Sequence, residues 1–221
     1  MKRAAAERAV AEIKDGMVLG LGSGSTAAFA IEALAVRVAA GLSIVGIPSS
    51  ERSAALARRL GVPLASFIEH RRIDLTIDGA DQVERGTLAL VKGLGGALLR
   101  EKIVASASAR MIVVVDETKL VERLGSRTPL PVEIVAFGWQ TVLDRLAAIG
   151  CAPRLRLLGE DPFVTDGGNY IADCAIPEIP DPAGVEGRLP GIVGVVESGL
   201  FVGLASKIMV GRTEGVEVIE R

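Results

Sequence analysis

Glycines and hydroxyl groups gather in one short motif, Gly20-Leu21-Gly22-Ser23-Gly24-Ser25-Thr26, which joins an apolar run to an alanine-rich helical pattern. Glycines at such a strand-to-helix turn let the backbone approach a ligand closely. The first turn of the following helix offers free N–H groups and a partial positive charge to an anion. The motif therefore suits a phosphate group, and a plain tight turn is the simpler alternative.

The spacing of this motif argues against two common nucleotide sites. Gly20 and Gly22 begin the dinucleotide pattern G-x-G-x-x-G, but position 25 is a serine and no acid ends the second apolar run to hold a ribose. A Walker A loop needs a lysine before its Ser or Thr, whereas Gly24 leads directly into Ser25. The remaining interpretation is a compact loop for one phosphate monoester.

Two carboxylates, Asp78 and Asp81, close the apolar stretch 73–77 and are separated by Gly79 and Ala80. Carboxylates at this spacing can bind Mg²⁺, accept hydrogen bonds from sugar hydroxyl groups, or cap the next element. No neighbouring motif supplies further obvious metal ligands, so the sequence predicts no metal site.

Lys92 leads into a glycine-rich bend at 93–96, and Glu101 lies about one turn into the helix that follows. Ala97 and Ala105 share a helical face with Glu101, so small side chains leave room for a ligand above the carboxylate. A carboxylate placed in this way suits general-base chemistry. The alternative is an exposed glutamate between two basic neighbours on the helix surface.

Apolar runs alternate with helical patterns along the first half of the chain. The runs cover 17–21, 42–47, 73–78 and 111–116, and the helical patterns cover 2–13, 26–40, 50–60 and 97–108. This alternation predicts an α/β fold with a Rossmann-like, mostly parallel sheet and helices on both faces. After Gly125 the pattern changes to a strand, a helix and two further strands, which indicates a smaller α+β domain. We expect residues 1–127 with 203–221 to form the Rossmann-like domain and residues 128–202 the small domain.

The polar motifs follow the predicted strands. The glycine motif follows the first strand, Pro48-Ser49-Ser50 the second and Asp78–Asp81 the third, and Asp116-Glu117-Thr118-Lys119 follows the run 111–115. Because the carboxyl ends of parallel strands meet at one edge of a sheet, where ligands bind, we expect these motifs to converge.

The composition narrows the class of protein. The 221 residues are 49% hydrophobic, and 25 Lys and Arg balance 27 Asp and Glu, so we expect a full core and no affinity for nucleic acid or an anionic membrane. Cys151, Cys174 and one histidine do not complete a usual zinc set, and both cysteines are interpreted as core residues. The sequence has neither a signal-peptide pattern nor a membrane-spanning apolar run, and we expect a cytoplasmic protein.

Seven motifs follow one another along the chain: GLGSGST, IDGAD, VKGLGGALLREKIV, DETK, PLPVEI, TDGGNYIADC and GLFVGLASKIMVG. In their order and approximate spacing they closely resemble the type A family of ribose-5-phosphate isomerases, nearly from end to end. One such motif would be a weak signal, whereas the whole series is specific.

The resemblance implies interconversion of D-ribose 5-phosphate and D-ribulose 5-phosphate in the non-oxidative pentose phosphate pathway, with no metal ion or organic cofactor. It also implies a homodimer or homotetramer. The family's proton-transferring glutamate falls on Glu101. Its phosphate and sugar contacts fall on Ser23, Gly24, Ser25, Thr26, Asp78, Gly79, Ala80, Asp81, Lys92, Gly93, Leu94, Gly95 and Lys119, and Lys2 matches a lysine that reaches phosphate.

In this reading Glu101 moves the proton between C2 and C1, and Lys92 with the N–H groups of the bend steadies the developing oxyanion. Asp78 and Asp81 position hydroxyl groups and assist proton movement between oxygens. The chain departs from the family at Leu94, where a glycine is common, so a contact that needs a positive φ at this position is in question.

Three other functions remain open at this point. A sugar-phosphate sensor domain would keep the phosphate loop and lose the base, whereas Glu101 is present and no helix-turn-helix extension is seen. A CoA transferase would use a glutamate as a nucleophile and needs a longer chain. An isomerase of another phosphosugar is the alternative that the sequence excludes least well.

Overall fold

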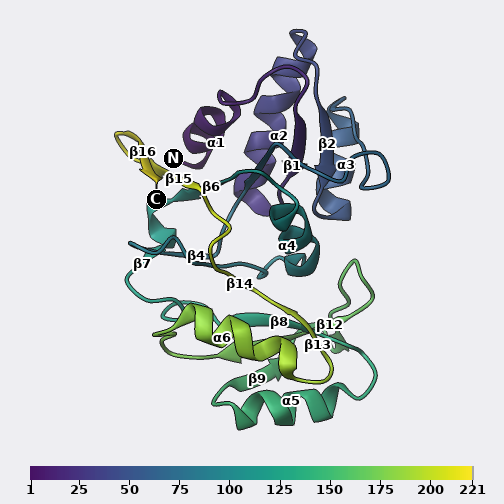
Figure 1. Cartoon of the computed structure of the whole chain (residues 1–221), viewed down its shortest axis with the longest axis vertical. Helices are drawn as coiled ribbons and strands as arrows, with labels where there is room; N and C mark the ends of the chain where they lie inside the picture. Colours follow the sequence, from purple (N-terminus) through teal and green to yellow (C-terminus); the bar gives the residue numbers. More distant parts are fainter. Residues whose placement is uncertain (221) are drawn as a thin grey trace. The chain divides into compact units, whose positions relative to one another are not determined.

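The structure is a computed structural model that describes residues 1–220 (Figure 1). Its contacts divide the chain into two compact units, residues 1–80, 100–119 and 203–221 in the first and residues 81–99 and 120–202 in the second. Residues 81–99 and 120–127, which were predicted in the Rossmann-like domain, belong to the second unit by this division. The domain boundaries at 127 and 202 stay a prediction.

A six-stranded sheet forms the centre of the first unit, in the order β16-β15-β6-β3-β1-β2. Its strands are β1 (Val18–Leu21), β2 (Val45–Pro48), β3 (Leu75–Asp78), β6 (Met111–Asp116), β15 (Lys207–Arg212) and β16 (Gly215–Glu220). All neighbours are parallel except β15 and β16, which form an antiparallel hairpin at one edge. The α/β class with a mostly parallel sheet is therefore confirmed.

Helices cover both faces of this sheet. The helices α1 (Lys2–Val10) and α2 (Gly24–Ala39) pack side by side (Figure 1), and their apolar side chains meet Leu19, Leu21 and Leu75. The opposite face receives Val104 of α4 (Leu98–Ser106), and α3 (Glu51–Arg59) packs beside β2. Gly20 makes the α4 packing possible, because a Cβ there would lie 2.6 Å from Val104. Strand alternation thus assigns each neighbouring residue to one helical layer.

The strand order reverses direction at β1. The chain runs from β1 through α2 to β2 on one side, and then crosses through α3 to β3 on the other side of β1. In open parallel sheets such a switch point leaves a crevice at the carboxyl ends of the two strands, and ligands bind there. The glycine motif and Asp78 occupy those two strand ends.

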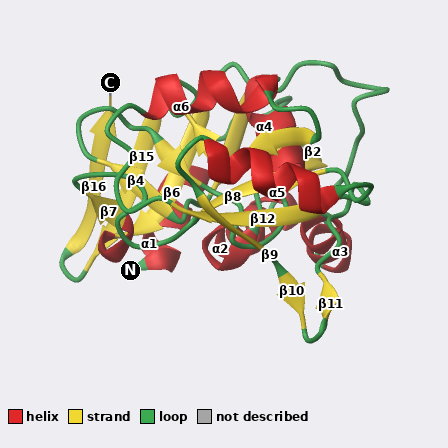
Figure 2. Cartoon of the chain, turned by 90° about the horizontal axis from the view of Figure 1, so that it is seen from below, coloured by secondary structure: helices red, strands yellow, loops and turns green. Residues whose placement is uncertain are grey.

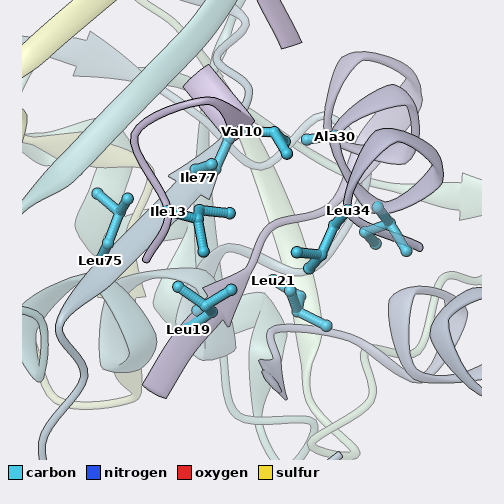
Figure 3. A pocket seen from close by; sticks show the side chains of 10 residues that line it. Val10, Ile13, Leu19, Leu21, Ala30, Leu34, Leu75 and Ile77 are labelled. Atoms are coloured by element: carbon cyan, nitrogen blue, oxygen red, sulfur yellow. The ribbon is translucent and has the colours of Figure 1, made fainter. Parts of the chain in front are cut away.

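One small void lies in the core of the first unit (Figure 3). Figure 3 shows apolar side chains of Ile13, Leu21, Leu34 and Ile77 around it. Its cavity volume is about 10 Å³. Because a buried water needs several polar partners, which this lining does not supply, the void is a dry packing defect.

The second unit contains two four-stranded sheets. One has the order β13-β8-β12-β9, formed by β8 (Leu130–Ile134), β9 (Ala152–Leu155), β12 (Tyr170–Ala175) and β13 (Val195–Ser198). The other has the order β14-β5-β4-β7, formed by β4 (Gln82–Glu84), β5 (Leu90–Val91), β7 (Leu120–Val121) and β14 (Leu200–Phe201). The hairpin β10 (Leu157–Leu158) and β11 (Asp161–Pro162) extends from the end of β9 (Figure 2).

Helices α5 (Trp139–Ala148) and α6 (Pro182–Arg188) contribute to the core of the second unit through Val142, Leu146 and Val185. Two 3₁₀ turns, η1 (Glu117–Lys119) in the first unit and η2 (Leu189–Gly191) in the second, complete the elements. Cys151 and Cys174 are buried in this second core, as predicted.

The predicted elements agree with the structure apart from their ends. Observed helices stop one to three residues short of the predicted bounds, as at Val10. The first strand predicted after Gly125 occupies Leu130–Ile134. The very short strands β4, β5, β7 and β14 were not predicted, because two or three residues carry no periodicity. Strands β15 and β16, near the end of the described residues, lie in the first sheet, with β15 beside β6.

The N-terminus rests on the returning segment. A Cβ at Gly211 of β15 would lie 2.3 Å from the carbonyl oxygen of Met1, so only a glycine leaves room for the start of α1. None of the helices within residues 1–220 is both long and apolar enough to span a membrane.

Candidate active site

The loop after β1 is tied to the end of β3 by backbone hydrogen bonds to Asp78. Oδ1 of this carboxylate accepts from the N–H of Ser23 at 2.9 Å and from the N–H of Gly79 at 2.7 Å. A Cβ at Gly22 would lie 2.2 Å from the same Oδ1, so glycine is required for this approach. Asp78 is 1% exposed and holds both sides of the switch point in register.

A cluster of four serines forms hydrogen bonds with one another and with the same loop. The hydroxyl of Ser23 lies 2.8 Å from that of Ser49 and 2.9 Å from that of Ser50, and Ser53 donates to the carbonyl of Gly22 at 2.7 Å. Ser49, Ser50 and Ser53 are all buried. The Ser23 hydroxyl is thus engaged in this cluster, and the more exposed hydroxyl of the motif belongs to Ser25.

The first turn of α2 carries the features of an anion site. This helix begins at Gly24 with a φ of +85°, has no acidic residue in its first turn, and has Ser25 exposed there. The ammonium group of Lys2 lies 3.5 Å from the Ser25 hydroxyl. Thr26, the second hydroxyl of the motif, is only 8% exposed. The free N–H groups and the nearby cation together suit a phosphate.

Asp116, at the end of β6, forms an ion pair with Lys2. Its Oδ2 is 3.6 Å from Nζ of Lys2, and its Oδ1 accepts from the hydroxyl and, at 3.0 Å, the N–H of Thr118. Burial raises the pKa of Asp116, but the Thr118 hydrogen bonds and the charges of Lys2 and Lys119 outweigh burial and lower the net pKa. The lowered pKa favours the ionised form of Asp116, and its carboxylate pairs with Lys2.

Glu101 lies in α4 and is 6% exposed. Ala97 and Ala105, the neighbours predicted to share its helical face, are also buried. Arg100 instead turns to the surface and pairs with Glu51 at 2.8 Å. Glu101 is therefore not part of an exposed charged triplet, which was the simpler interpretation of the sequence.

The other predicted residues belong to the second unit, where they form a bend after β5. The N–H of Leu94 donates to Oδ2 of Asp81 at 2.9 Å, and Gly96 closes the bend by donating to the carbonyl of Gly93 at 3.0 Å. Lys92 is 2% exposed, with its ammonium group 5.5 Å from the centre of the Phe201 ring. Asp81 therefore fixes the bend that follows Lys92.

Backbone geometry resolves the question raised by Leu94. Gly93 and Gly96 take the positive φ angles, +103° and +84°, whereas Leu94 lies outside the left-handed region and is exposed. A leucine therefore fits at this position without strain. Gly95 is exposed, and a Cβ added to it would meet nothing within 4 Å among the described residues.

Within the first unit, hydrogen bonds link Ser23, Asp78 and Gly79 at the switch point, and Lys2 lies beside Ser25 and Asp116. Glu101 lies in α4 and Lys119 in η1, and Ala80 is the last residue before the second unit. Asp81 and the bend 92–96 form their own group in the second unit. Two supporting residues were not predicted, because neither lies in a recognisable motif. Ser53 donates to the carbonyl of Gly22 in the glycine loop, and Arg156 donates to the carbonyls of Gly93 and Leu94 in the bend. Among residues 1–220, no group of three or more His, Cys, Asp or Glu side chains gathers as a metal site.

Comparisons with known proteins identify the family of the chain. Residues 45–215 match the family model described as ribose 5-phosphate isomerase A (phosphoriboisomerase A). Ribose-5-phosphate isomerase A of Gloeobacter violaceus is 56% identical over 219 residues, which cover 99% of this chain and 95% of that protein. The Gluconobacter oxydans protein of the same name is 53% identical, with 98% and 94% of the two chains covered.

Solved structures give the same result for the fold. Ribose 5-phosphate isomerase A of Methanocaldococcus jannaschii matches with a TM-score of 0.95 at 39% identity, covering 100% of this chain and 98% of that one. A D-ribose-5-phosphate isomerase in complex with phospho-erythronic acid matches with the same score and identity, covering 100% and 97%. On the evidence of motifs, fold and full-length similarity, this chain belongs to the ribose-5-phosphate isomerase A family.

Proposed function

We propose that this chain interconverts D-ribose 5-phosphate and D-ribulose 5-phosphate through an enediolate intermediate. Membership of an isomerase family over nearly the whole chain supports the reaction. The structural observation that carries the mechanism is Glu101, a buried carboxylate whose helical-face neighbours are alanines.

Glu101 acts as the base. In the open-chain aldose its carboxylate takes the proton from C2, the C–H electrons form the C1–C2 double bond, and the carbonyl oxygen at C1 gains the negative charge. Protonated Glu101 then returns the proton to C1 while the hydroxyl proton at C2 moves to the oxygen at C1, which leaves the ketose. A single carboxylate can both remove and return the proton, which suits this role.

Lys92 and the N–H groups of the bend stabilise the oxyanion. A buried ammonium group and fixed peptide N–H groups need no reorganisation when negative charge develops, and this gives them their effect on the transition state. The closed bend, held by Asp81 through Leu94, supports this assignment.

The phosphate group anchors the far end of the sugar. The first turn of α2, with Ser25 and Thr26, supplies N–H and hydroxyl donors, and Lys2 and Lys119 supply positive charge. Binding energy from this remote group holds C2 against the base and so lowers the barrier of the chemical step.

Asp78 and Asp81 accept hydrogen bonds from sugar hydroxyl groups and assist ring opening. Each already accepts a backbone N–H, from Ser23 and Leu94 respectively. Their first contribution is therefore to hold the two loops in place.

The complex of a similar enzyme with phospho-erythronic acid supports the proposal. That ligand is a phosphorylated four-carbon acid, and its carboxylate resembles the two oxygens of an enediolate. A fold that binds such a molecule suits a phosphosugar and its transition state. We further propose a homodimer or homotetramer in the cytoplasm, as the resemblance implies.

The test is an assay of the purified protein with ribose 5-phosphate, following the appearance of ribulose 5-phosphate. We expect turnover that persists in EDTA, weak or no turnover of unphosphorylated ribose, and one mass above the monomer by light scattering. No turnover of ribose 5-phosphate beside robust turnover of another phosphosugar would replace the substrate assignment. Binding without any turnover would favour the sensor alternative.

A further inference from the structure

We propose that Arg156 is a positioning residue for the isomerisation, because its guanidinium group sets the direction of the peptide N–H groups in the bend after Lys92. The inference rests on the proposed function for its effect on turnover. The contacts that carry it all lie within the second unit.

Arg156 makes two hydrogen bonds to the bend. One nitrogen, Nη1, donates to the carbonyl oxygen of Gly93 at 2.9 Å and to that of Leu94 at 3.0 Å. In a trans peptide the C=O and the N–H of the same unit point in opposite directions. Fixing these two carbonyls therefore turns the N–H groups of Leu94 and Gly95 away from Arg156.

The two N–H groups have different fates. That of Leu94 meets Oδ2 of Asp81 at 2.9 Å, on the side opposite the guanidinium group. That of Gly95 forms no hydrogen bond within residues 1–220, and Gly95 itself is exposed with open space around its Cα. Arg156 thus prepares one oriented donor of the kind that an oxyanion requires.

Asp173 holds the guanidinium group from its other edge. Nε of Arg156 donates to Oδ2 of Asp173 at 2.9 Å, and Nη2 donates to Oδ1, so the pair is bidentate. The side chains are only 13% and 24% exposed, which limits screening by water. Because Arg156 follows β9 directly and Asp173 is in β12, the adjacent strands of the sheet carry both partners.

Phe163 packs against the same bend. Its ring lies 5.9 Å from the Arg156 guanidinium carbon, and a Cβ on Gly96 would come within 2.5 Å of that ring. The backbone N–H of Phe163 donates to the carbonyl of Arg156 at 2.9 Å. The bend is therefore held by a hydrogen-bonded cation, a carboxylate and an aromatic ring, and only the cation contacts its carbonyls directly.

The geometry needs an arginine. A lysine presents a point charge and cannot satisfy Asp173 bidentately while also reaching two carbonyl oxygens. The variant Arg156→Lys therefore separates positioning from a simple charge effect, because it keeps the positive charge and loses the planar, bidentate guanidinium group.

The experiment compares Arg156→Gln and Arg156→Lys with wild type, and uses Arg154→Gln as the matched control. Arg154 is an exposed arginine in β9, two residues before Arg156. It lies opposite Asp173 of the adjacent strand β12. Two measurements are made on each variant: kcat and KM with ribose 5-phosphate, and amide hydrogen exchange at Leu94 and Gly96.

We expect kcat to fall roughly 10- to 100-fold in both Arg156 variants, below the effect of deleting an oxyanion donor outright, with KM within about threefold. The Leu94 and Gly96 amides should exchange at least about tenfold faster. Arg154→Gln should match wild type in both. Full kcat in Arg156→Lys, or unchanged exchange in the variants, overturns the proposal.

Asp173→Asn provides a second variant in case Arg156→Gln does not fold. It keeps Arg156 and weakens the bidentate pair, so a smaller loss of kcat and a smaller rise in exchange are expected. A lower melting temperature with unchanged kcat would mean a purely structural role and also overturns the proposal. If wild type itself fails to isomerise ribose 5-phosphate, the proposed function fails, and the exchange measurement alone then decides whether Arg156 orients the bend.

Discussion

The backbone N–H of Ser23 and Oδ1 of Asp78 lie 2.9 Å apart, although 55 positions separate the two residues in the chain. This hydrogen bond joins the carboxyl ends of β1 and β3 at the point where the strand order reverses. A substitution at Asp78 therefore disturbs the loop as well as any chemistry. Residues that do not hold the loop give clearer tests of the mechanism.

Glu101→Gln removes the proposed base with little change of shape. We expect kcat to fall at least about 100-fold, the usual contribution of a general base, with KM within a few-fold of wild type. The assay follows formation of ribulose 5-phosphate, and a urea titration reports folding. Arg100→Gln, at the neighbouring surface pair with Glu51, is the matched control and should retain activity. Near-normal turnover in Glu101→Gln would remove Glu101 from the mechanism.

Lys2→Ala tests the phosphate anchor. Hydrogen bonds to charged groups contribute about 1.5 kcal/mol or more, so KM for ribose 5-phosphate should rise roughly tenfold. The exposed Lys14, also near the N-terminus, provides the control variant Lys14→Ala, which should leave KM unchanged. A KM unaffected by loss of Lys2 contradicts its placement at the phosphate.

Asp116 predicts a pH dependence of stability. Its pKa in the folded protein lies below the ordinary value, so its ionisation stabilises the fold fully above the unfolded-state pKa of about 3.9. That contribution disappears as the pH falls from there through the lower, folded pKa. Wild type should therefore lose stability more steeply than Asp116→Asn below about pH 4. Parallel curves of unfolding free energy against pH would exclude this role for Asp116.

Gly95→Ala tests whether a ligand lies against the bend. An added Cβ meets no described atom within 4 Å, and the backbone is outside the left-handed region, so the free energy of unfolding should change by less than about 0.5 kcal/mol. Yet kcat/KM should fall roughly tenfold or more, because the methyl group displaces a closely bound substrate. Gly187→Ala, which is equally open, should leave kcat/KM unchanged. Equal activity in both variants would place the substrate elsewhere.

Leu34→Ala enlarges the dry void of the first core. Leu34 is 2% exposed and lines the void, so unfolding free energy should fall by about 2–5 kcal/mol from lost burial and added cavity. Val36 is in the same helix but 71% exposed, and Val36→Ala should change stability by less than about 0.5 kcal/mol. Urea titrations of the two variants measure the difference. A similar small loss in both would mean that the core closes around the enlarged void.

The sequence predicted what depends on periodicity and on strand ends. Alternating strands and helices identify a mostly parallel sheet, and a parallel sheet gathers its strand ends at one edge, so Ser25 and Asp78 were expected together. The helical spacing of Ala97, Glu101 and Ala105 also predicted that these three residues share one face. These inferences need only local patterns and one rule of topology.

Other features depend on contacts that no local pattern encodes. Ser53 reaches the glycine loop only because α3 begins beside β2, and Arg156 reaches Gly93 across 63 positions of sequence. Leu94 left open whether the bend needs a positive φ at position 94, and the structure places the positive φ angles at Gly93 and Gly96 instead. Local sequence patterns therefore do not predict hydrogen-bond partners that are distant in the chain, and they do not predict exact backbone angles.

The contact between Met1 and Gly211 has a consequence for biosynthesis. Lys2 stands in the first turn of the chain, yet the β15 strand against which that turn rests is translated after the entire second unit. While the ribosome is still making the middle of the protein, the start of α1 lacks its final support. The turn that carries the proposed phosphate anchor therefore gains its final support only after β15 has left the exit tunnel.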